Sequence, residues 1–568
     1  MWTSRTGRRW SLRPSDPARA HAITLACGIS PLAARVLAAR GYDASSARSF
    51  LAPGLNSLLD PAGILHLPTA VDRIEAALRR GEHIRLVTDY DVDGTTSCLI
   101  LHAALDRRIQ ALGSTATISY HIPDRFVEGY GLSSIAVEKA AAEQVGLLIT
   151  ADIGVRDHAS IRRARELSLD TLVCDHHLPA GEDVPPDALA VICPPQVGCS
   201  YPNKSLAACG VSLKLATALL AGDSRRDEVL GSMLKLAAVG TIADVVDIAN
   251  PENRAIVALG LEGLSRGRHS PGLKALLEVA GLTGQEIDAG AVGFRIAPRI
   301  NAAGRLKDAN AVVRLLRERD PDAAMAQARA LDALNRERQG IQSRLVDQVL
   351  AGIADPPPSF VVAAGPEPEG WHRGVVGIVA AKVREKTQRP VAVVSVMGEW
   401  ATGSIRSVPQ IHAVRALDSV SGMLRRYGGH AAAAGFTLPT DKLPAFERGL
   451  CDFVDAVVGE GSLVGEEEAD VQLSAHQLNV QLVQDLRIFE PTGKGNPQPR
   501  FRVDGPIDRP KVMKETHLKF RVGGLDAVWW GQAECLPLLE HATAVIGTVG
   551  LNQWNGNTSV QITVEDVL

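Results

Sequence analysis

Short apolar segments alternate with helical segments through the first half of the chain. Residues 83–88 (HIRLVT) have the length and composition of a buried strand, and a helix is predicted at 95–105. Four further apolar runs follow, with room for a helix between neighbours, at residues 116–121, 146–150, 171–174 and 188–192. Because strands that alternate with helices pair in one direction, this pattern predicts a parallel α/β sheet.

Helical spacing also dominates on either side of this region. Residues 21–80 are rich in Ala, Leu and Arg and are interpreted as helical. Between residues 320 and 354, apolar side chains recur every three, four or seven positions, which predicts one long helix that ends before Pro356. A second α/β segment is expected over residues 359–458, and the Gly- and Glu-rich residues 459–468 are interpreted as a linker.

The last hundred residues have a different period. Polar and apolar residues alternate at 517–522 and 559–564, between Gly-rich turns, which predicts a small β-rich domain. A chain of 568 residues is too long for a single hydrophobic core. The expected fold class is therefore a multidomain α/β protein: a parallel-sheet domain, a long connecting helix, a smaller α/β domain and a C-terminal β-rich domain.

Composition narrows the choice of partners. The formal net charge is −4, so a surface that binds phosphates must be local rather than general. The eight cysteines form no C-x-x-C pair, which favours reduced thiols and a cytoplasmic location. The N-terminus lacks the apolar segment of a signal peptide, and no apolar run is long enough to predict a membrane span.

The sequence also lacks the Walker A, H-E-x-x-H and G-x-S-x-G motifs, which argues against an ATP-driven helicase and a serine hydrolase.

Aspartate and histidine follow four apolar segments, each interpreted as a strand. They are Asp89–Gly94 (DYDVDG), Asp152, Asp175–His177 (DHH) and Asp244, which follows residues 237–243. Since parallel strands bring their carboxyl ends to one edge of the sheet, we expect these side chains to lie close together. Clustered carboxylates repel one another unless a cation compensates them.

The ligand types point to Mn²⁺ or Mg²⁺, because carboxylates and imidazole suit these ions and no thiolate is present for Zn²⁺. Two such ions would clamp the attacking and leaving oxygens of a phosphodiester. Each motif alone is commonly a turn or a helix cap, so the pattern by itself leaves a metal site and a structural role both open.

These motifs, with Gly240–Val246 (GTIADVV) around Asp244, resemble the four ordered motifs of the DHH phosphoesterase superfamily, and within it the RecJ family of bacterial exonucleases. The similarity extends over nearly the whole chain after about residue 45. Further similar stretches are 121–132 (HIPDRFVEGYGL), 298–306 (PRINAAGRL), 334–339 (LNRERQ), 370–381 (GWHRGVVGIVAA), 403–407 (GSIRS), 427–435 (YGGHAAAAG) and 489–501 (FEPTGKGNPQPRF).

The resemblance implies a two-metal (Mn²⁺ or Mg²⁺) exonuclease that degrades single-stranded DNA from its 5′ end to mononucleotides, in DNA repair and recombination. It implies metal ligands at Asp91, Asp93, Asp152, His176 and Asp244. Asp175 and His177 would be catalytic or orienting residues, and Asp89 a supporting one. Two positions depart from the family pattern, Ile153 and Cys193, which puts detail near the metals in doubt.

The resemblance also implies a pocket for the 5′-terminal phosphate. Its expected residues are Arg125, Arg305, Ser404 and Arg406, with Arg299 a weaker candidate, because the arginine fork matches phosphate oxygens. An exposed arginine is more often only solvated. His430 would either approach DNA or form a tight turn, and Trp371 and His372 would either stack on bases or pack between domains.

By this resemblance the domains are an N-terminal helical segment (1–50), a DHH catalytic domain (51–319), a connecting helix (320–355), a DHH-associated domain (356–460) and an OB-fold-like domain (465–568). Single-stranded DNA is the expected partner, with a helicase and a single-strand-binding protein implied, and the chain is expected to be a monomer. Two rivals remain: a DHH phosphoesterase for short RNA, cyclic dinucleotides or pyrophosphate, and a non-catalytic DNA-binding scaffold.

Overall fold

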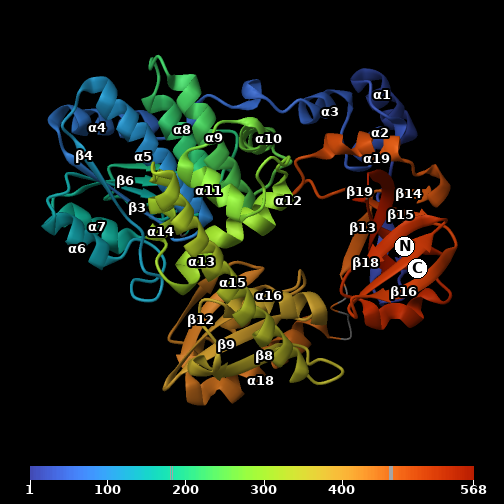
Figure 1. The fold of residues 1–568 in the computed structure, drawn as a ribbon. Coiled ribbons are helices and arrows are strands. Elements are labelled where there is room, and N and C mark those ends of the chain that lie inside the picture. The colour runs from blue at the N-terminus through green and yellow to red at the C-terminus, as the bar shows by residue number, and fades with distance from the viewer. Residues whose placement is uncertain (180, 182, 460–462, 464, 555) are drawn as a thin grey trace. The chain divides into compact units, whose positions relative to one another are not determined.

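The computed structural model covers all 568 residues and describes them except 180, 182, 460–462, 464 and 555. The chain forms two compact units (Figure 1). The first, here called the parallel-sheet unit, contains Ser45–Asn335 and Ile488–Gln498, and the second unit contains Met1–Ala44, Arg336–Arg487 and Pro499–Leu568. Each is described by itself.

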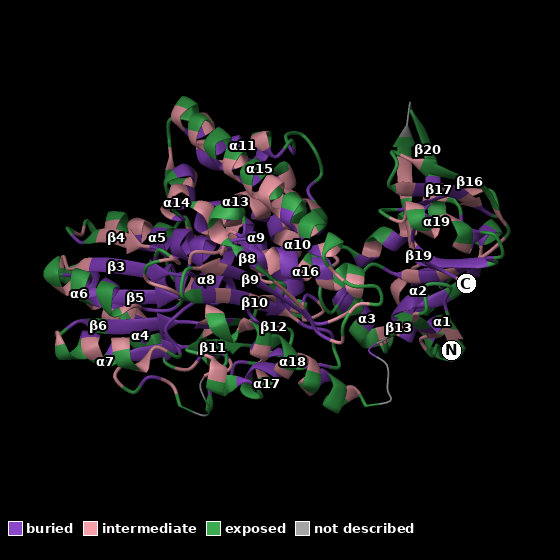
Figure 2. Ribbon diagram, turned by 90° about the horizontal axis from the view of Figure 1, so that it is seen from below, coloured by how far each residue is buried: buried purple, intermediate pink, exposed green. Residues whose placement is uncertain are grey.

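A five-stranded sheet forms the centre of the parallel-sheet unit, with all strands parallel as predicted. Apolar side chains pack on both faces, so every strand except β4 is largely buried (Figure 2). In sheet order the strands are β4 (Thr117–His121), β3 (His83–Thr88), β5 (Leu147–Ala151), β6 (Asp170–Cys174) and β7 (Ala190–Ile192). One face packs against α4 (Leu67–Arg80), α5 (Val92–Leu112) and α8 (Ala208–Leu219), and the other against α6 (Ser134–Ala142) and α7 (His158–Glu166).

Helices make up the rest of this unit. They are α9 (Arg226–Ala243), α10 (Pro251–Arg266), α11 (Pro271–Val279), α12 (Ala289–Ala291), α13 (Ala297–Leu306) and α14 (Asn310–Arg317). One prediction was wrong here: residues 237–243, interpreted as a strand before Asp244, are the last turns of α9. An apolar run that is buried has the same composition in a strand or a helix, and its alanines favour the helix. The predicted long helix is α15 (Pro321–Ala351), and α5 extends beyond the predicted 95–105 at both ends.

A segment from near the end of the chain completes the parallel-sheet unit. Residues Ile488–Gln498 lie against α10, where the Arg254 side chain is almost fully buried. Its guanidinium donates hydrogen bonds to the carbonyls of Phe50, Phe489, Glu490 and Pro491, at 2.7–3.4 Å. A buried cation thus donates to several backbone oxygens, from both Phe50 and the segment Ile488–Gln498.

The second unit contains a five-stranded mixed sheet, β11-β12-β10-β9-β8. Its strands are β8 (Val361–Pro366), β9 (Val391–Met397), β10 (Trp400–Arg406), β11 (Arg426–Gly429) and β12 (Ala433–Pro439), accompanied by α16 (Val376–Thr387), α17 (Ala413–Asp418) and α18 (Leu443–Val458). Ser404 and Arg406, expected in a turn led by Gly403, lie instead within β10. The glycine does not break the strand because the Phe436 ring occupies the place of a side chain at Gly403.

The C-terminal region is rich in β-strands, as predicted. The sheet order is β14-β15-β19-β20-β18-β17-β16. The strands are β14 (Val471–Ser474), β15 (Arg500–Asp504), β16 (Ile507–Met513), β17 (His517–Val522), β18 (Leu525–Trp529), β19 (Ala544–Trp554) and β20 (Asn557–Val567), with α19 (Val480–Asp485) between β14 and β15. The described part of the chain contains no helix long and apolar enough to cross a membrane.

The N-terminus is not only helical, which corrects the first prediction for residues 1–50. Two strands, β1 (Trp2–Thr3) and β2 (Arg9–Leu12), precede α1 (Pro17–Cys27), α2 (Pro31–Ala39) and α3 (Ala44–Leu51). Strand β2 pairs in parallel with β13 (Glu466–Ala469), so part of the predicted 459–468 linker is a strand. Residues 460–462 and 464 of that linker lie outside the described residues.

Candidate metal centre

The turn between β3 and α5 carries three aspartates. Asp91 caps α5, and its Oδ1 accepts a hydrogen bond from the Gly94 amide at 3.1 Å. A Cβ at Gly94 would lie 2.4 Å from the Asp89 carbonyl oxygen, so the turn requires glycine. Asp93 is held from the opposite side, where its carboxylate accepts from the amides of Ala208 and Cys209 at the start of α8, at 2.7 and 2.8 Å. The carboxylates are therefore fixed by backbone groups.

The next two strands place their functional groups at the same edge. Asp152 follows β5 with φ of 65°, a left-handed conformation that aspartate tolerates better than most residues. Asp175 follows β6, and its Oδ1 accepts from the amides of His176 and His177 at 2.7 and 3.1 Å and from His177 Nδ1 at 2.8 Å. This network orients both histidines before any ligand binds.

His176 lies at the centre of the cluster. Its Nε2 is 3.2 Å from Asp152 Oδ1 and 3.9 Å from Asp93 Oδ2, and its Nδ1 is 3.7 Å from Asp244 Oδ2. Asp244 reaches this position as the C-terminal cap of α9. Ligand atoms of Asp89, Asp91 and Asp152 form a second group, all within 4.8 Å of one another. Asp152, His176 and His177 form a third such group, so the candidate ligands fall in three overlapping sets, two of which contain Asp152.

Electrostatic repulsion within the cluster is strong. Burial raises the pKa of Asp89 and Asp152 well above the ordinary aspartate range, and neighbouring carboxylates raise it further. Burial and the charges of Asp93 and Asp91 raise the pKa of Asp244 to about 8. Burial lowers the pKa of His176, which favours its neutral form. A divalent cation would reverse the shifts of the carboxylates and reinforce that of His176, since it favours ionised carboxylates and a neutral imidazole.

Two orphaned atoms also fit a metal. Asp89 Oδ1 and His176 Nε2 are buried, and neither has a hydrogen-bond partner among the residues that the structure describes. Buried polar atoms are nearly always paired, so both require a ligand. Oxygen and imidazole donors without thiolates suit Mn²⁺ and Mg²⁺. The donor set of this chain therefore fits the expected ions.

Asp175 and His177 are paired with each other. Burial alone would raise the pKa of Asp175, but the hydrogen bond with His177, the charges of both histidines and the Val155 amide together lower it. For His177, burial acts to lower the pKa, and the hydrogen bond and charge of Asp175, with the charges of Asp244 and Asp93, together raise it. The pair is an internally satisfied acid and base, which suits the orienting role that the sequence suggested for it.

Tyr130 also belongs to this site, although the sequence analysis assigned it no role. Its hydroxyl lies 3.3 Å from the Asp152 carbonyl oxygen and 3.2 Å from His177 Nε2. The side chain is 56% exposed, so one edge contacts the cluster while the rest faces solvent. In the sequence, the signal for this role was its position in Glu128–Gly131, within the family-like stretch 121–132.

Two of the expected phosphate-binding arginines lie beside the acidic turn. The Arg125 guanidinium stacks over the Tyr90 ring, 4.2 Å from its centroid. Helix α13 approaches Tyr90 so closely that a Cβ at Gly304 would lie 2.6 Å from the Tyr90 carbonyl oxygen, which brings Arg305 to the same turn. Arg299 is separate from them, since its guanidinium pairs with Asp332 at 2.9 Å and donates to the Val279 carbonyl.

The remaining candidates lie in the second unit. Arg406 Nη1 donates to Ser404 Oγ at 2.8 Å, and both side chains lie against Gly377 in the first turn of α16. Burial lowers the pKa of Arg406, and no ion pair holds this residue within the part of the chain that the structure describes. A half-buried cation beside a helix N-terminus is suited to bind an anion.

His430 follows β11, and its amide donates to the Ala433 carbonyl, whose residue is the register partner of Arg406. The Trp371 side chain is only 5% exposed and fills the space over Gly365 in β8, as a core residue does. His372 Nδ1 accepts from the Gly374 amide at 3.0 Å. The exposed surface of Trp371 is too small for a base to stack on it.

The two departures from the family pattern are buried. Ile153 and Cys193 both lie in the apolar cluster beneath α6 and α7. Cys193 Sγ lies 3.4 Å from the His177 carbonyl oxygen. Both therefore support the site from behind and contribute no candidate ligand atom.

Comparisons with known proteins agree with this geometry. Three family models match: "DHH family, N-terminal domain" over residues 83–241, "DHHA1 domain" over residues 358–456 and "RecJ OB domain" over residues 469–566. The single-stranded-DNA-specific exonuclease RecJ of Salmonella typhimurium is 35% identical over 96% of this chain and 96% of its own length. That of Escherichia coli is 33% identical over 95% and 96%.

Solved structures give the same assignment. RecJ from Thermus thermophilus in complex with Mn²⁺ is 33% identical, covers 99% of this chain and 80% of its own, and superposes with a TM-score of 0.83. The same protein in complex with Mg²⁺ is matched with a TM-score of 0.76, at 30% identity, over 98% of this chain and 78% of its own. The chain therefore belongs to the RecJ family, whose named members are single-stranded-DNA-specific exonucleases.

Proposed function

We propose that this chain is a metal-dependent exonuclease that hydrolyses single-stranded DNA from the 5′ end and releases 5′-mononucleotides. One observation carries the proposal: His176 lies within 4 Å of carboxylates from three separate elements of the parallel-sheet unit. The proposed ligands are Asp91, Asp93, Asp152, His176 and Asp244, with Asp89 in support. The proposed ions are two Mn²⁺ or Mg²⁺.

The chain's own residues would prepare this reaction. Divalent cations, when bound, would neutralise phosphate charge and lower the pKa of the attacking water. Because Asp175 accepts from His177 Nδ1, the imidazole carries a proton there, and its Nε2 lies 3.2 Å from the Tyr130 hydroxyl. His177 can thus exchange a proton at Nε2 while Asp175 keeps its ring in place. The amides of Ala208 and Cys209 hold Asp93 at a fixed position.

Selection of a 5′ end would come from the arginines. We propose Arg125 and Arg305, beside the acidic turn, and Ser404 and Arg406, in β10, as contacts to the terminal phosphate. His430 and His372 are weaker candidates for contact with the strand. Arg299 and Trp371 are occupied by an ion pair and by core packing respectively, which supports structural roles for both.

A polarity assay tests the proposal directly. Two single-stranded oligonucleotides of one sequence, labelled at the 5′ or the 3′ end, would be digested with Mn²⁺ and resolved by length. We expect labelled mononucleotide at once from the 5′-labelled strand and a ladder of shortening fragments from the other. The reverse pattern would contradict the proposed direction, and cleavage within a closed circular strand would contradict an exonuclease.

The proposed partners follow from the substrate. The chain has no Walker A motif, so we propose that a separate helicase supplies single strands in repair and recombination, and that a single-strand-binding protein covers them. We propose a monomer in the cytoplasm. Light scattering during size-exclusion chromatography would test the monomer: a mass twice that of the chain would contradict it.

A further inference from the structure

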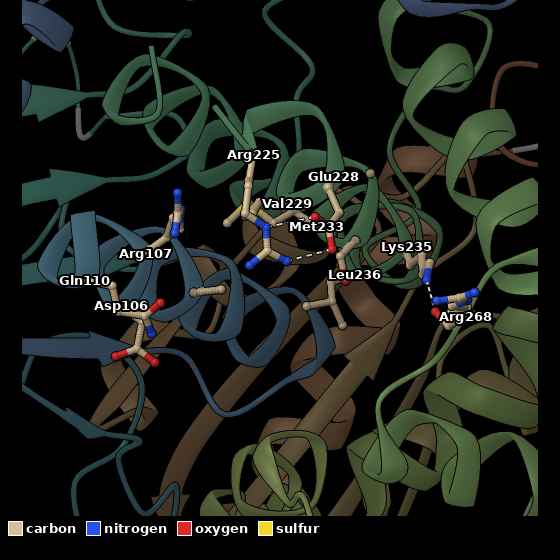
Figure 3. A pocket seen from close by; sticks show the side chains of 13 residues that line it. Asp106, Arg107, Gln110, Arg225, Glu228, Val229, Met233, Lys235, Leu236 and Arg268 are labelled. Carbon is tan, nitrogen blue, oxygen red and sulfur yellow. Dashed lines mark hydrogen bonds and ion pairs between the residues drawn. The ribbon is translucent and has the colours of Figure 1, made fainter. Parts of the chain in front are cut away.

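A groove lies on the parallel-sheet unit between α5 and α9, away from the acidic turn where α5 begins. It consists of two adjoining hollows of about 560 and 310 Å³, which share Ala103, Asp106 and Lys235 in their linings. Figure 3 shows the larger hollow, with Lys235 and Arg268 at one end and Asp106 and Arg107 at the other. Volumes of this order are those of small-ligand sites.

The groove is cationic although the chain is acidic. Six basic side chains line the two hollows and three carboxylates oppose them, whereas the formal net charge of the chain is −4. Arg107 and Arg225 are paired with Asp223 and Glu228. In the described part of the chain, by contrast, no ion pair holds the remaining four, which are Lys235, Arg268, Arg317 and Arg319. The groove thus offers positive charge to a ligand.

Lys235 lines both hollows of the groove. It is 8% exposed, and its stem lies against Gly263 and Gly267, where a side chain would displace it. Its ammonium donates to the Arg268 carbonyl just beyond the end of α10, which fixes its position. An ammonium has three donors, and among the described residues no carboxylate forms an ion pair with this one, so burial lowers its pKa. A buried charge in this state is unfavourable unless an anion joins it.

The smaller hollow adds a second unpartnered group. His102 is 3% exposed and lies 3.4 Å from Asp106 through Nδ1, while its buried Nε2 has no hydrogen-bond partner among the described residues. Beside it begins α11, with Ser270 as its cap. A helix N-terminus attracts phosphate, and the apolar side chains of Leu99 and Leu273 in the same hollow would suit a nucleobase.

We propose that this groove binds a phosphate-bearing ligand of nucleotide size, with its phosphate against Lys235 and Arg268. The ligand would be either a free nucleoside monophosphate or one nucleotide of a bound strand, because both present the same phosphate and base. The site is separate from the metal centre, so it can be tested without hydrolysis.

Hydrogen–deuterium exchange of the full-length protein with Mn²⁺ locates binding. The two probes are deoxyadenosine monophosphate and a nuclease-resistant phosphorothioate oligothymidylate. We expect protection of peptides that cover residues 226–237 and 266–275. Protection by the mononucleotide alone identifies a free nucleotide as the ligand, and protection also by the oligonucleotide identifies a passing strand. Protection by neither would overturn the proposal.

Two matched variants assign the effect to the groove. Arg268→Gln removes a lining guanidinium but keeps the carbonyl that fixes Lys235, and should weaken binding at these peptides about tenfold. Arg266→Gln is the control, since Arg266 is exposed on α10, pairs only with Glu262 and does not line the groove. Lys235→Met should abolish the protection. Equal protection in Arg268→Gln and Arg266→Gln would overturn the assignment. If the unaltered protein did not hydrolyse DNA, that result would count only against the proposed exonuclease.

Discussion

The two five-stranded sheets of the molecule hold charge in opposite ways. In the parallel sheet, the inner strands β3, β5 and β6 are largely buried, and the carboxylates of the site gather beyond the strand ends, at Asp89, Asp152 and Asp175. In the mixed sheet, β10 carries Ser404 and Arg406 within the strand itself. Helix α16 begins against that face, so a strand position there can reach a ligand. In a parallel sheet covered on both faces, functional side chains lie beyond the strand ends. In a sheet with one face partly uncovered, they can also lie within a strand.

The charges differ in sign as well. The edge of the parallel sheet collects carboxylates that repel one another, which suits cations, while Arg406 is a half-buried cation without an ion pair among the described residues, which suits an anion. A DNA strand would supply both opposite charges. Metal ions that accompany the scissile phosphate would balance the carboxylates, and the terminal phosphate would be the anion for Arg406. The following substitutions, and removal of the metal, test whether these two regions have different functions.

The largest effect is expected at the sheet edge. Asp152→Asn keeps the shape of the side chain and removes a charge that belongs to two of the three candidate ligand sets, so kcat/KM should fall about a thousandfold. Release of acid-soluble nucleotides with Mn²⁺ measures it. Unaltered digestion would remove Asp152 from the site, and circular dichroism on the same sample would show whether the variant is folded.

A smaller and more selective effect is expected in β10. Arg406→Ala should reduce the preference for a 5′-phosphate over a 5′-hydroxyl about tenfold, because a charge-assisted contact is lost while the metal centre is intact. The ratio of kcat/KM for the two substrates is the readout. Arg406→Lys restores charge without the fork and should recover only part of the ratio.

Arg299→Ala is the matched control for that ratio. Because its guanidinium pairs with Asp332 in α15, the change should leave the phosphate preference unaltered and lower the free energy of unfolding by about 1–3 kcal/mol. Denaturant titration measures the second quantity. A lower phosphate preference in Arg299→Ala would place this arginine with Arg406 instead.

Metal removal should make stability depend on pH in a defined direction. The metal-free folded protein holds protons on Asp152 and Asp244, whose pKa values are raised, while the unfolded chain releases them near the ordinary aspartate range. The folded state therefore binds more protons, and its stability falls as the pH rises from about 4 to about 8. Scanning calorimetry should show a Tm increase on addition of Mn²⁺ that is larger at the upper end of this window. An equal increase at both ends would contradict the raised pKa values.

The smallest effect is expected at Tyr130. Tyr130→Phe removes the hydroxyl beside His177 Nε2 and keeps the ring, so kcat should fall only about two- to tenfold. A change in KM without a change in kcat would instead make the ring a contact for the strand. Single-turnover kinetics separate these outcomes.

Much of the parallel sheet could be predicted, because each buried strand is a short apolar run that ends in a polar motif. Asp244 shows the limit: residues 237–243 are apolar throughout, and such a run does not distinguish a strand from a buried helix. The amides that hold Asp93 gave no signal at all, since backbone donors of Ala208 and Cys209 are the same in any sequence. Strand β2 was missed because its partner β13 lies at the other end of the chain.

The Arg254 side chain has a consequence for synthesis of the protein. Its buried guanidinium depends on carbonyls of Phe489, Glu490 and Pro491, which leave the ribosome long after α10 and the whole mixed sheet. The parallel-sheet unit therefore cannot complete its structure until residues 489–491 have been synthesised. A nascent chain that stopped before residue 488 would lack these three acceptors of Arg254, so the free energy of unfolding of its parallel-sheet unit should be lower than in the full chain.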